Sequence, residues 1–564
     1  MSQYLWQVLP PAPPEFLSRA SGLHPLLLQL LYNRGMRDPA QGKSFLAADE
    51  RLCYDPWLLP EMGQAVNRLC RALLSGEKIA VYGDYDTDGI TATALLVQGL
   101  EAVGANTIPY IPNRLQGHGL HPPALASLFQ QGATLVITAD CGTTCYQEVA
   151  EAQKRGQDIL ITDHHTCPPQ LPPALATVNP KRPDSTYPYP ELAGVGVAYK
   201  LLQALYRALG RDHTAGSALD LVALGTVTDV APLTGENRYL VKEGLRLINR
   251  THRVGLQEML RCAGLEPGRV DAGSIAWTLG PRLNAAGRLE HAFLSYHLLL
   301  TTSSQEGQLL AQELETKNSE RQRLLEESLV KAREQALAQG EARLVLVQDR
   351  DVPVGVAGLV ASRLVDELRR PAVVVRIGRE TCRGSGRSVP GFNLVAALQE
   401  NAELLLRFGG HPMAAGFSIT PQNLALLGER LREKAQRALE GLDVRPQLTI
   451  DAEVPLSALE SPFLASLPNL APFGFGNPTP VFLSRGVKVL NSRPVGDGGR
   501  HLRLKLQAGP VSWPAVAFNR GIDGQLPPAL DIVFSLKTDH WGGRETLELN
   551  LLDFRPGSPP GQGR

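Results

Sequence analysis

Three aspartates at alternate positions follow a short apolar segment near residue 80. The stretch from residue 81 to 96 reads VYGDYDTDGITATALL and contains Asp84, Asp86 and Asp88. Asp and Gly are common in turns, so a tight turn between a strand and a helix would explain these residues. Alternate carboxylates on a loop can also converge on a divalent cation, so this stretch by itself leaves both interpretations open.

Three other segments carry acids or histidines at the predicted end of a strand or helix. Asp140 follows TLVIT, Asp163, His164 and His165 follow DILIT, and Asp229 stands in GTVTD. Each residue has an ordinary structural explanation, such as a helix cap or a hydrogen-bonded core histidine. Their joint occurrence in one region favours a metal site instead. Carboxylates mixed with imidazoles suit Mn²⁺ or Mg²⁺, and the imidazole favours Mn²⁺.

The elements that must position these residues alternate between strand and helix over residues 46–240. KIAVYGD, TLVITAD and DILITDHH predict strands, and the segments between them predict helices. Such alternation is typical of a parallel sheet with crossover helices. Open parallel sheets carry their sites beyond the carboxyl ends of the strands, which is where the Asp and His residues stand.

The rest of the chain divides into further parts that differ in residue composition and hydrophobic pattern. Residues 305–340 predict a long helix that acts as a spacer and has no other role. Short alternating segments separated by Gly and Pro predict a small all-β, barrel-like domain at the C-terminal end. The predicted division is an N-terminal segment 1–45, a metal-binding α/β domain 46–240, a helical connection 241–340, a second α/β domain 341–440, the all-β domain 446–556 and a disordered tail 557–564.

Composition sets further limits on the function. The 564 residues contain 56 basic and 56 acidic side chains, so a nucleic-acid site would have to be a local patch. Residues 363–387 contain seven Arg against three acids, and residues 485–505 contain six Lys or Arg against one Asp. For both stretches, the alternative is that the charged residues form an ordinary solvated surface. The seven Cys include no CxxC pair, and the sequence shows neither a signal sequence nor an apolar run long enough to cross a membrane. These features predict a cytoplasmic protein outside the membrane.

The motifs, taken in order, resemble a known family. DYDTDG, ADCGTT, TDHH and GTVTDVAPL are similar to the four motifs of the DHH phosphoesterase superfamily. GPRLNAAGRLEHA, GVAGLVASRL, GSGRS, GGHPMAAG and LAPFGFGNPTPVF extend the resemblance to its bacterial single-strand-specific DNA exonucleases, over residues 45–555. Relatives usually have Ala at Thr87, many have Tyr at His118, and many have Trp-His near Val352 and Pro353. These departures leave the metal positions intact.

The resemblance implies a fold, an activity and a metal centre. The fold has a metal-bearing α/β domain, a long linking helix, a second α/β domain that closes a groove, and a C-terminal OB-fold. The activity is 5′-to-3′ hydrolysis of single-stranded DNA to 5′-mononucleotides, in DNA repair and recombination. Two divalent cations, Mn²⁺ or Mg²⁺, would be bridged by Asp140. Asp86 would hold one cation, and Asp88, His164 and Asp229 the other.

Other roles implied by the resemblance are less direct. Asp84 is either a ligand or a hydrogen-bond acceptor beside one, and His165 faces the scissile phosphate or orients a ligand. A helicase and a single-strand-binding protein are possible partners besides single-stranded DNA. GGHPMAAG would place His411 on a Gly-rich loop close to DNA. The residues expected to contact phosphate or DNA are Arg114, Arg282, Arg288, Ser385, Arg387 and His411.

Two other functions are compatible with the same motifs. One is a DHH phosphodiesterase that acts on short oligonucleotides, cyclic dinucleotides or pyrophosphate. The chain length and the predicted barrel argue against it. The other is a non-catalytic scaffold that binds single strands. Loss of metal ligands would mark such a scaffold, and all the expected ligands are present.

Overall fold

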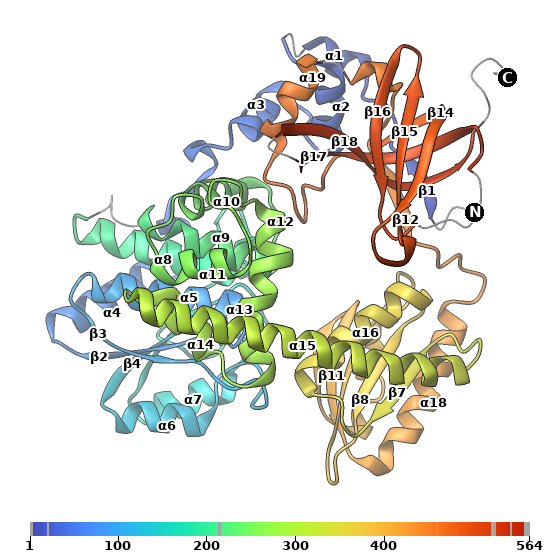
Figure 1. The fold of residues 1–564 in the computed structure, drawn as a ribbon. Helices are drawn as coiled ribbons and strands as arrows, with labels where there is room; N and C mark the ends of the chain where they lie inside the picture. The colour runs from blue at the N-terminus through green and yellow to red at the C-terminus, as the bar shows by residue number, and fades with distance from the viewer. Residues whose placement is uncertain are drawn as a thin grey trace. The chain divides into compact units, whose positions relative to one another are not determined.

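The computed structural model describes residues 4–19, 22–211, 216–459, 461–520, 526–541 and 544–557. The chain forms two compact units (Figure 1), one of residues 50–444 and one that combines residues 1–49 with 445–564. The tail predicted from residue 557 lies, after Gly557, outside the described residues. Within these ranges, none of the helices combines the length and apolar character needed to cross a bilayer.

The first sheet is fully parallel, as the sequence predicts. Its strand order is β3-β2-β4-β5-β6. The strands are β2 (Lys78–Tyr82), β3 (Asn106–Tyr110), β4 (Ala133–Thr138), β5 (Asp158–Thr162) and β6 (Ala176–Val178). The three central strands are apolar because both faces are covered by helices. The edge strands β3 and β6 escaped prediction, since one contains Pro109 and the other has only three residues.

Helices cover both faces of this sheet and divide its core in two. Ile79 and Val81 of β2 join one cluster, and Ala80 and Tyr82 join the other, as the alternation of a strand requires. The first cluster contains α4 (Met62–Leu74), α5 (Thr87–Glu101), α8 (Gly194–Ala208) and α9 (Leu219–Thr228). The second contains α6 (Pro122–Gln130) and α7 (Tyr146–Lys154).

A helical region leads from the first sheet to the second. It comprises α10 (Gly235–Ile248), α11 (Val254–Cys262), α12 (Ala272–Ser274), the π-helical turn η4 (Ile275–Leu279), α13 (Gly280–Leu289) and α14 (Phe293–Leu300). The long helix α15 spans Ser304–Ala338, which agrees with the predicted helix at 305–340. It packs against α11, α13 and α14 near its start and against α16 (Val354–Leu368) near its end (Figure 1).

The second sheet is mixed, with strand order β10-β11-β9-β8-β7. β7 (Val345–Asp349) and β8 (Ala372–Arg376) are parallel, whereas β9 (Cys382–Arg387), β11 (Ala414–Ile419) and β10 (Leu405–His411) are antiparallel. α17 (Leu394–Gln399) and α18 (Pro421–Ala438) complete the region. The prediction of a Gly-rich loop at GGHPMAAG is therefore wrong, because this stretch forms the β10–β11 hairpin. GSGRS lies largely on β9, where Gly384 leaves room for the ring of Phe417.

The second unit is built around a closed barrel. β14 (Phe482–Val495), β15 (His501–Ala508), β16 (Val511–Ala517), β18 (Arg544–Pro556) and β17 (Ala529–Trp541) pair in that order, and β17 pairs again with β14. The short β13 (Ala452–Glu453) adds to β14. Closure removes the exposed edges of a small sheet. The predicted C-terminal barrel is confirmed.

The first residues of the chain belong to this barrel unit. β1 (Leu5–Val8) pairs in parallel with β12 (Gln447–Ile450). α1 (Pro14–Arg19), α2 (Pro25–Asn33) and α3 (Pro39–Ala47) contribute to the same core as the barrel. Asn477 of the PFGFGNPTPVF motif is fully buried, accepts a hydrogen bond from Arg34 Nε and donates to the carbonyl oxygens of Leu470 and Pro472. That motif therefore supports the fold of the unit.

Candidate metal centre and phosphate-binding groups

The predicted acidic residues meet at the carboxyl edge of the first sheet. Asp84 and Asp86 follow β2, and Asp86 caps α5 by accepting a hydrogen bond from Gly89 N–H at 3.2 Å. Gly89 is required at this turn, because a Cβ there would lie 2.6 Å from the backbone nitrogen of Asp84. The sharp turn brings the carboxylates of Asp84 and Asp86 close together. Both interpretations of the loop therefore hold, since it is a turn and it also gathers acids.

Asp88 is held by the start of a helix more than a hundred residues away. Its carboxylate accepts hydrogen bonds from the N–H groups of Gly194 and Val195, at 2.7 and 2.9 Å, in the first turn of α8. The positive end of the helix dipole favours an anion at this place. Burial and the neighbouring Asp86 nevertheless raise the pKa of Asp88 to about 7.

Asp140 has an unusual backbone conformation, and its carboxylate lies close to those of Asp84 and Asp86. Its φ is 64°, in the left-handed region, and its N–H donates to the carbonyl oxygen of Thr162 on the neighbouring strand. Gly194 again leaves the necessary room, because a Cβ there would lie 2.4 Å from Asp140 Oδ1. A non-glycine residue with this φ is strained, and such strain is concentrated at functional sites.

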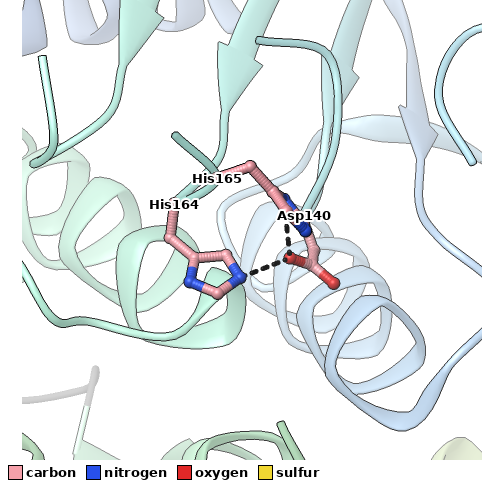
Figure 2. A group of neighbouring side chains, drawn as sticks. All are labelled: Asp140, His164 and His165. Atoms are coloured by element: carbon pink, nitrogen blue, oxygen red, sulfur yellow. Dashed lines mark ion pairs between the residues drawn. The ribbon is translucent and has the colours of Figure 1, made fainter. Parts of the chain in front are cut away.

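Both histidines of the DHH motif lie beside Asp140 (Figure 2). His164 Nε2 lies 3.2 Å and His165 Nδ1 lies 3.9 Å from Asp140 Oδ1. His164 is buried, whereas His165 is about one-third exposed and so remains open to a substrate. Burial, followed by the charge of His165, lowers the pKa of His164 to about 3, which keeps its imidazole neutral and able to bind a metal.

Asp163, the first residue of that motif, orients the two histidines. Its Oδ1 accepts hydrogen bonds from the backbone N–H groups of His164 and His165, and it lies 2.7 Å from the ring Nδ1 of His165. Its Oδ2 accepts from the N–H of Thr143. Burial alone would raise the pKa of Asp163, but the hydrogen bond and charge of His165 lower it below its usual range. The sequence analysis gave Asp163 no role of its own, although its position directly before two histidines was a usable signal.

Asp229 completes the cluster from the end of α9. It caps the helix and is followed by Val230 at φ 60°, a strained conformation for a β-branched residue. Burial and the charges of Asp88 and Asp86 raise the pKa of Asp229 to about 9. Burial and the charge of Asp84 raise the pKa of Asp86, and burial with the charges of Asp88 and Asp86 holds the pKa of Asp140 well above its usual range. The four carboxylates of Asp86, Asp88, Asp140 and Asp229 therefore all have raised pKa values, because they are buried close to other acids.

These side chains fall into three groups whose ligand atoms lie within 4.8 Å of one another. Asp88, His164 and Asp229 form one group, Asp84, Asp86 and Asp140 form a second, and Asp140 joins both histidines in a third. Asp84 Oδ1, Asp140 Oδ1 and His164 Nε2 are buried without a hydrogen-bond partner among the described residues. Unpaired buried acceptors that repel one another fit divalent cations, which supply the missing positive charge. Asp140 belongs to the second and third groups, and His164 belongs to the first and third.

His118, one of the departures from related sequences, lies at the rim of this cluster. Its Nδ1 is 3.1 Å from Asp84 Oδ2, and its ring meets that of His165 edge-on at 4.7 Å between centroids. Burial alone would lower the pKa of His118, but the carboxylate of Asp84 raises it to about 9. Thr87, a second departure, is buried, and its hydroxyl has no hydrogen-bond partner within the described ranges.

The residues predicted to contact phosphate do not form one uniform set. Arg288 donates from Nη1 to the carbonyl oxygen of Gly355, and Arg387 donates to that of Gly386. In the part of the chain that the structure describes, neither forms an ion pair with a carboxylate. A Cβ at Gly358 would lie 2.9 Å from Ser385 Oγ and 3.2 Å from Arg387 Nη2, so Ser385 and Arg387 lie together beside α16. These three residues remain available for an anion.

Arg282, Arg114 and His411 have other surroundings. Arg282 pairs with Glu315 on α15 through Nε at 2.5 Å, so a glutamate already compensates its charge. The guanidinium of Arg114 lies over the ring of Tyr85 at 4.2 Å, and its Nε donates to the carbonyl oxygen of Gly287. His411 is exposed at the end of β10. The metal candidates therefore lie together, whereas the expected phosphate contacts are spread over several elements.

The parallel sheet, the DHH sequence at its carboxyl edge and the converging acids define a protein of the DHH phosphoesterase superfamily. Family models match three parts of the chain. The DHH family N-terminal domain matches residues 78–226, the DHHA1 domain matches 341–437 and the RecJ OB domain matches 450–553.

Known proteins give a more specific assignment. The chain is 36% identical to the single-stranded-DNA-specific exonuclease RecJ of Bacillus subtilis, over 98% of this chain and 71% of that protein. It is 32% identical to RecJ of Escherichia coli, over 95% of this chain and 96% of that protein. The chain belongs to the RecJ family.

Solved structures agree with this assignment. RecJ of Thermus thermophilus in complex with Mn²⁺ matches with a TM-score of 0.86 and 34% identity, over 99% of this chain and 80% of that one. The same protein in complex with Mg²⁺ matches with a TM-score of 0.80 and 32% identity, over 99% of this chain and 79% of that one.

Proposed function

We propose that this protein hydrolyses single-stranded DNA from the 5′ end and releases 5′-mononucleotides. The observation that carries this proposal is the buried cluster around Asp140, where acids with raised pKa values and unpaired ligand atoms stand next to uncompensated arginines. Cations and a phosphate together would satisfy both sets of charges. Family membership supports single-stranded DNA as the substrate.

Two divalent cations, Mn²⁺ or Mg²⁺, would be held by the residues of the three groups. Asp88, His164 and Asp229 would hold one, Asp86 with Asp84 the other, and Asp140 both. When bound, such a pair lowers the pKa of an attacking water and stabilises charge on the phosphate. The protein's own part is to fix the ligands, through the N–H groups of Gly194 and Val195 on Asp88 and through Asp163 on the histidines. His165, partly exposed and fixed by Asp163, would contact the scissile phosphate.

The 5′-to-3′ polarity needs a further group of residues. A metal centre by itself does not distinguish a strand end from an internal phosphate. A pocket for the terminal 5′-phosphate would stop the strand one nucleotide beyond the scissile bond. Arg288, Ser385 and Arg387 are suited to this task, because arginine offers a planar pair of donors to two phosphate oxygens.

The barrel would bind the strand without reading its sequence. A groove of about 310 Å³ on the barrel is lined by Arg493, Arg503 and Lys505, together with Asn491, Leu504, Ser512 and Pro514. Phe518 is about half exposed and could stack on a base. Trp513, whose ring is packed in the barrel core, is unsuited to stacking.

Each predicted domain would have its own task in this activity. We assign metal binding to residues 46–240, the closing of the groove to 341–440 and strand binding to 446–556, with 241–340 connecting them. A role in DNA repair and recombination in the cytoplasm, beside a helicase and a single-strand-binding protein, accords with such an activity.

A direct assay tests the proposed function. The protein is incubated with Mn²⁺ or Mg²⁺ and with end-labelled single strands, matching duplexes and dinucleotides. Release of mononucleotides from the 5′ end of single strands is expected. Cleavage of dinucleotides alone would indicate a small phosphodiesterase, and binding without cleavage would indicate a scaffold.

A further inference from the structure

His118 stands on a loop beside the metal centre, between β3 and α6. Gly117 and Gly119 flank it with φ values of 95° and 98°, which favour glycine. The hydroxyl of the buried Tyr82 donates to the carbonyl oxygen of Gly119 at 3.3 Å, and a Cβ at Gly119 would lie 2.9 Å from Cys145 Sγ. The loop is therefore anchored directly after His118, which gives the imidazole a defined position.

The carboxylate of Asp84 links His118 to the metal centre. His118 Nδ1 lies 3.1 Å from Asp84 Oδ2, within hydrogen-bond distance. An imidazole can donate from Nδ1 whether or not its second nitrogen carries a proton. The side chain of Asp84 is buried, and its other oxygen, Oδ1, has no hydrogen-bond partner among the described residues. One oxygen of Asp84 thus has a partner within the protein, and the other is left unpaired.

The unpaired oxygen belongs to a carboxylate that lies among other acids. Asp84, Asp86 and Asp140 each offer one ligand atom, and these atoms lie within 4.8 Å of one another. A buried acceptor without a donor costs free energy, and a divalent cation would remove that cost. Because His118 holds Oδ2, Asp84 would bind such a cation through Oδ1.

The ring of His118 makes a second contact, with His165. The two rings meet edge-on with 4.7 Å between their centroids, and the ring of His164 lies at the same distance from that of His165. His165 Nδ1 lies 2.7 Å from Asp163 Oδ1. His118 is therefore one of three neighbours that restrict the ring of His165, the residue proposed above to contact the scissile phosphate.

A tyrosine, which many related sequences have at this position, would not make the same contact with Asp84. The hydroxyl of tyrosine lies at the far end of its ring, whereas histidine has a donor on a ring atom next to the point of attachment. The contact between His118 and Asp84 therefore depends on the histidine of this chain.

We propose that His118 is a positioning residue of the metal centre, which holds Asp84 so that Oδ1 binds a divalent cation and restrains His165 through its ring. The inference rests on the two-cation function proposed above. It makes Asp84 a ligand, which the sequence left open. Hydrogen-bond partners of metal-binding carboxylates orient them, and losing such a partner costs about 10–100-fold in metal affinity.

Two variants separate the two contacts of His118. H118F keeps an aromatic ring and has no donor, whereas H118N keeps a side-chain N–H donor close to the position of Nδ1 and has no ring. H252F is the matched control, because His252 is exposed in the segment between α10 and α11. The variant H118A, which also lacks the donor, replaces H118F if the latter does not fold.

Calorimetric titration with Mn²⁺, without DNA, tests the contact with Asp84. H118F is expected to weaken the binding of one cation about tenfold, whereas H118N and H252F should remain within about threefold of the wild type. In a D84N background, H118F should cause no further loss, because His118 acts through Asp84. Unchanged Mn²⁺ binding in H118F, or the same loss in the D84N background, would overturn the proposal. This result stands even if the wild type fails to degrade single strands, which would refute only the exonuclease function.

Hydrolysis of a single strand at saturating Mn²⁺ tests the contact with His165. H118F should then regain a kcat within about twofold of the wild type, since added metal compensates a loss of affinity. H118N should keep a kcat lowered about threefold or more, because a less restrained His165 is misplaced more often. A wild-type kcat in H118N would show that the ring of His118 does not position His165.

Discussion

The unit of residues 50–444 contains two clusters of opposite charge, a largely buried acidic one and a partly buried basic one. At the carboxyl edge of the first sheet, carboxylates lie close together and the pKa values of Asp140 and Asp229 are raised. On α13 and α15, burial and the charges of other arginines lower the pKa values of Arg288 and Arg321. Neither cluster is neutralised by the protein itself.

A buried pair elsewhere in the same unit shows the contrast. Lys200 and Glu236 are both fully buried, and they form an ion pair at 2.8 Å with further hydrogen bonds to their neighbours. That pair needs no ligand. The two clusters instead carry unpaired atoms, which a metal ion would satisfy in one case and a phosphate in the other. Charged groups that the fold leaves unpaired are concentrated at binding sites, and their sign indicates the charge of the ligand.

Removing the bridging acid should give the largest effect. Asp140→Asn is expected to reduce hydrolysis in Mn²⁺ by about a thousandfold or more, because a metal-based mechanism contributes several kcal/mol. Single-strand binding through the barrel should persist. Hydrolysis of a labelled strand and filter binding measure the two effects. Asp351→Asn, in an exposed loop, is the control. Retention of more than about a tenth of the activity would disprove the bridging role of Asp140.

The barrel provides a third charged surface, and this one is open to solvent. Replacing Arg493, Arg503 and Lys505 together by Gln should weaken binding of long single strands by more than about tenfold at low salt. It should also reduce the slope of log K against log salt by about 2, at about 0.7 per lost phosphate contact.

The control changes three cations outside the barrel. Arg430, Lys434 and Arg437 of α18 form ion pairs with Glu403, Glu400 and Glu433. Their replacement by Gln should leave both affinity and slope close to wild type. Equal slopes in the barrel variant and the wild type would show that the strand does not use this groove.

Arg387→Ala should separate the function of the basic cluster from that of the acidic cluster. The wild type is expected to cut 5′-phosphorylated strands faster than 5′-hydroxyl strands. In the variant the phosphorylated rate should fall about tenfold, since hydrogen bonds to charged groups contribute about 1.5–3 kcal/mol. Arg379→Ala, on an exposed turn, is the control. Equal slowing on both strands would instead connect Arg387 with the scissile phosphate or with the fold.

The smallest expected effect is on the stability of the metal-free protein. Asp88, Asp229 and His118 have pKa values of about 7, 9 and 9, all above their ordinary values. The folded state thus holds more protons than the unfolded state, so stability falls as pH rises from 7 to 9. The pKa of His164 is about 3, below its ordinary value, so that group does not titrate in this window.

Thermal unfolding in a chelator measures this dependence. The melting temperature should fall by a few degrees between pH 7 and 9, and Asp229→Asn should flatten the change. Mn²⁺ should reverse the trend, because metal binding displaces protons and strengthens as pH rises. A melting temperature that rises with pH in the chelator would contradict the assignment of raised pKa values to these acids.

The sequence by itself determined the features that depend on neighbouring residues. Apolar runs fixed β2, β4 and β5, and the uninterrupted helix-forming composition fixed α15 to within two residues at each end. The acids at the strand ends followed directly, because parallel strands place their carboxyl ends at one edge. The order of the motifs indicated the family.

Only the tertiary structure decided which charged side chains are paired within the protein and which remain free to bind a ligand. Arg282 and Arg288 stand on the same helix, yet Glu315 compensates only Arg282, and it does so from another helix. Asp88 receives its N–H donors from α8, and the first strand of the chain pairs with β12, more than four hundred residues away. Such partners are set by how elements pack, since hydrogen bonds and ion pairs depend on distances in space that local sequence patterns do not encode.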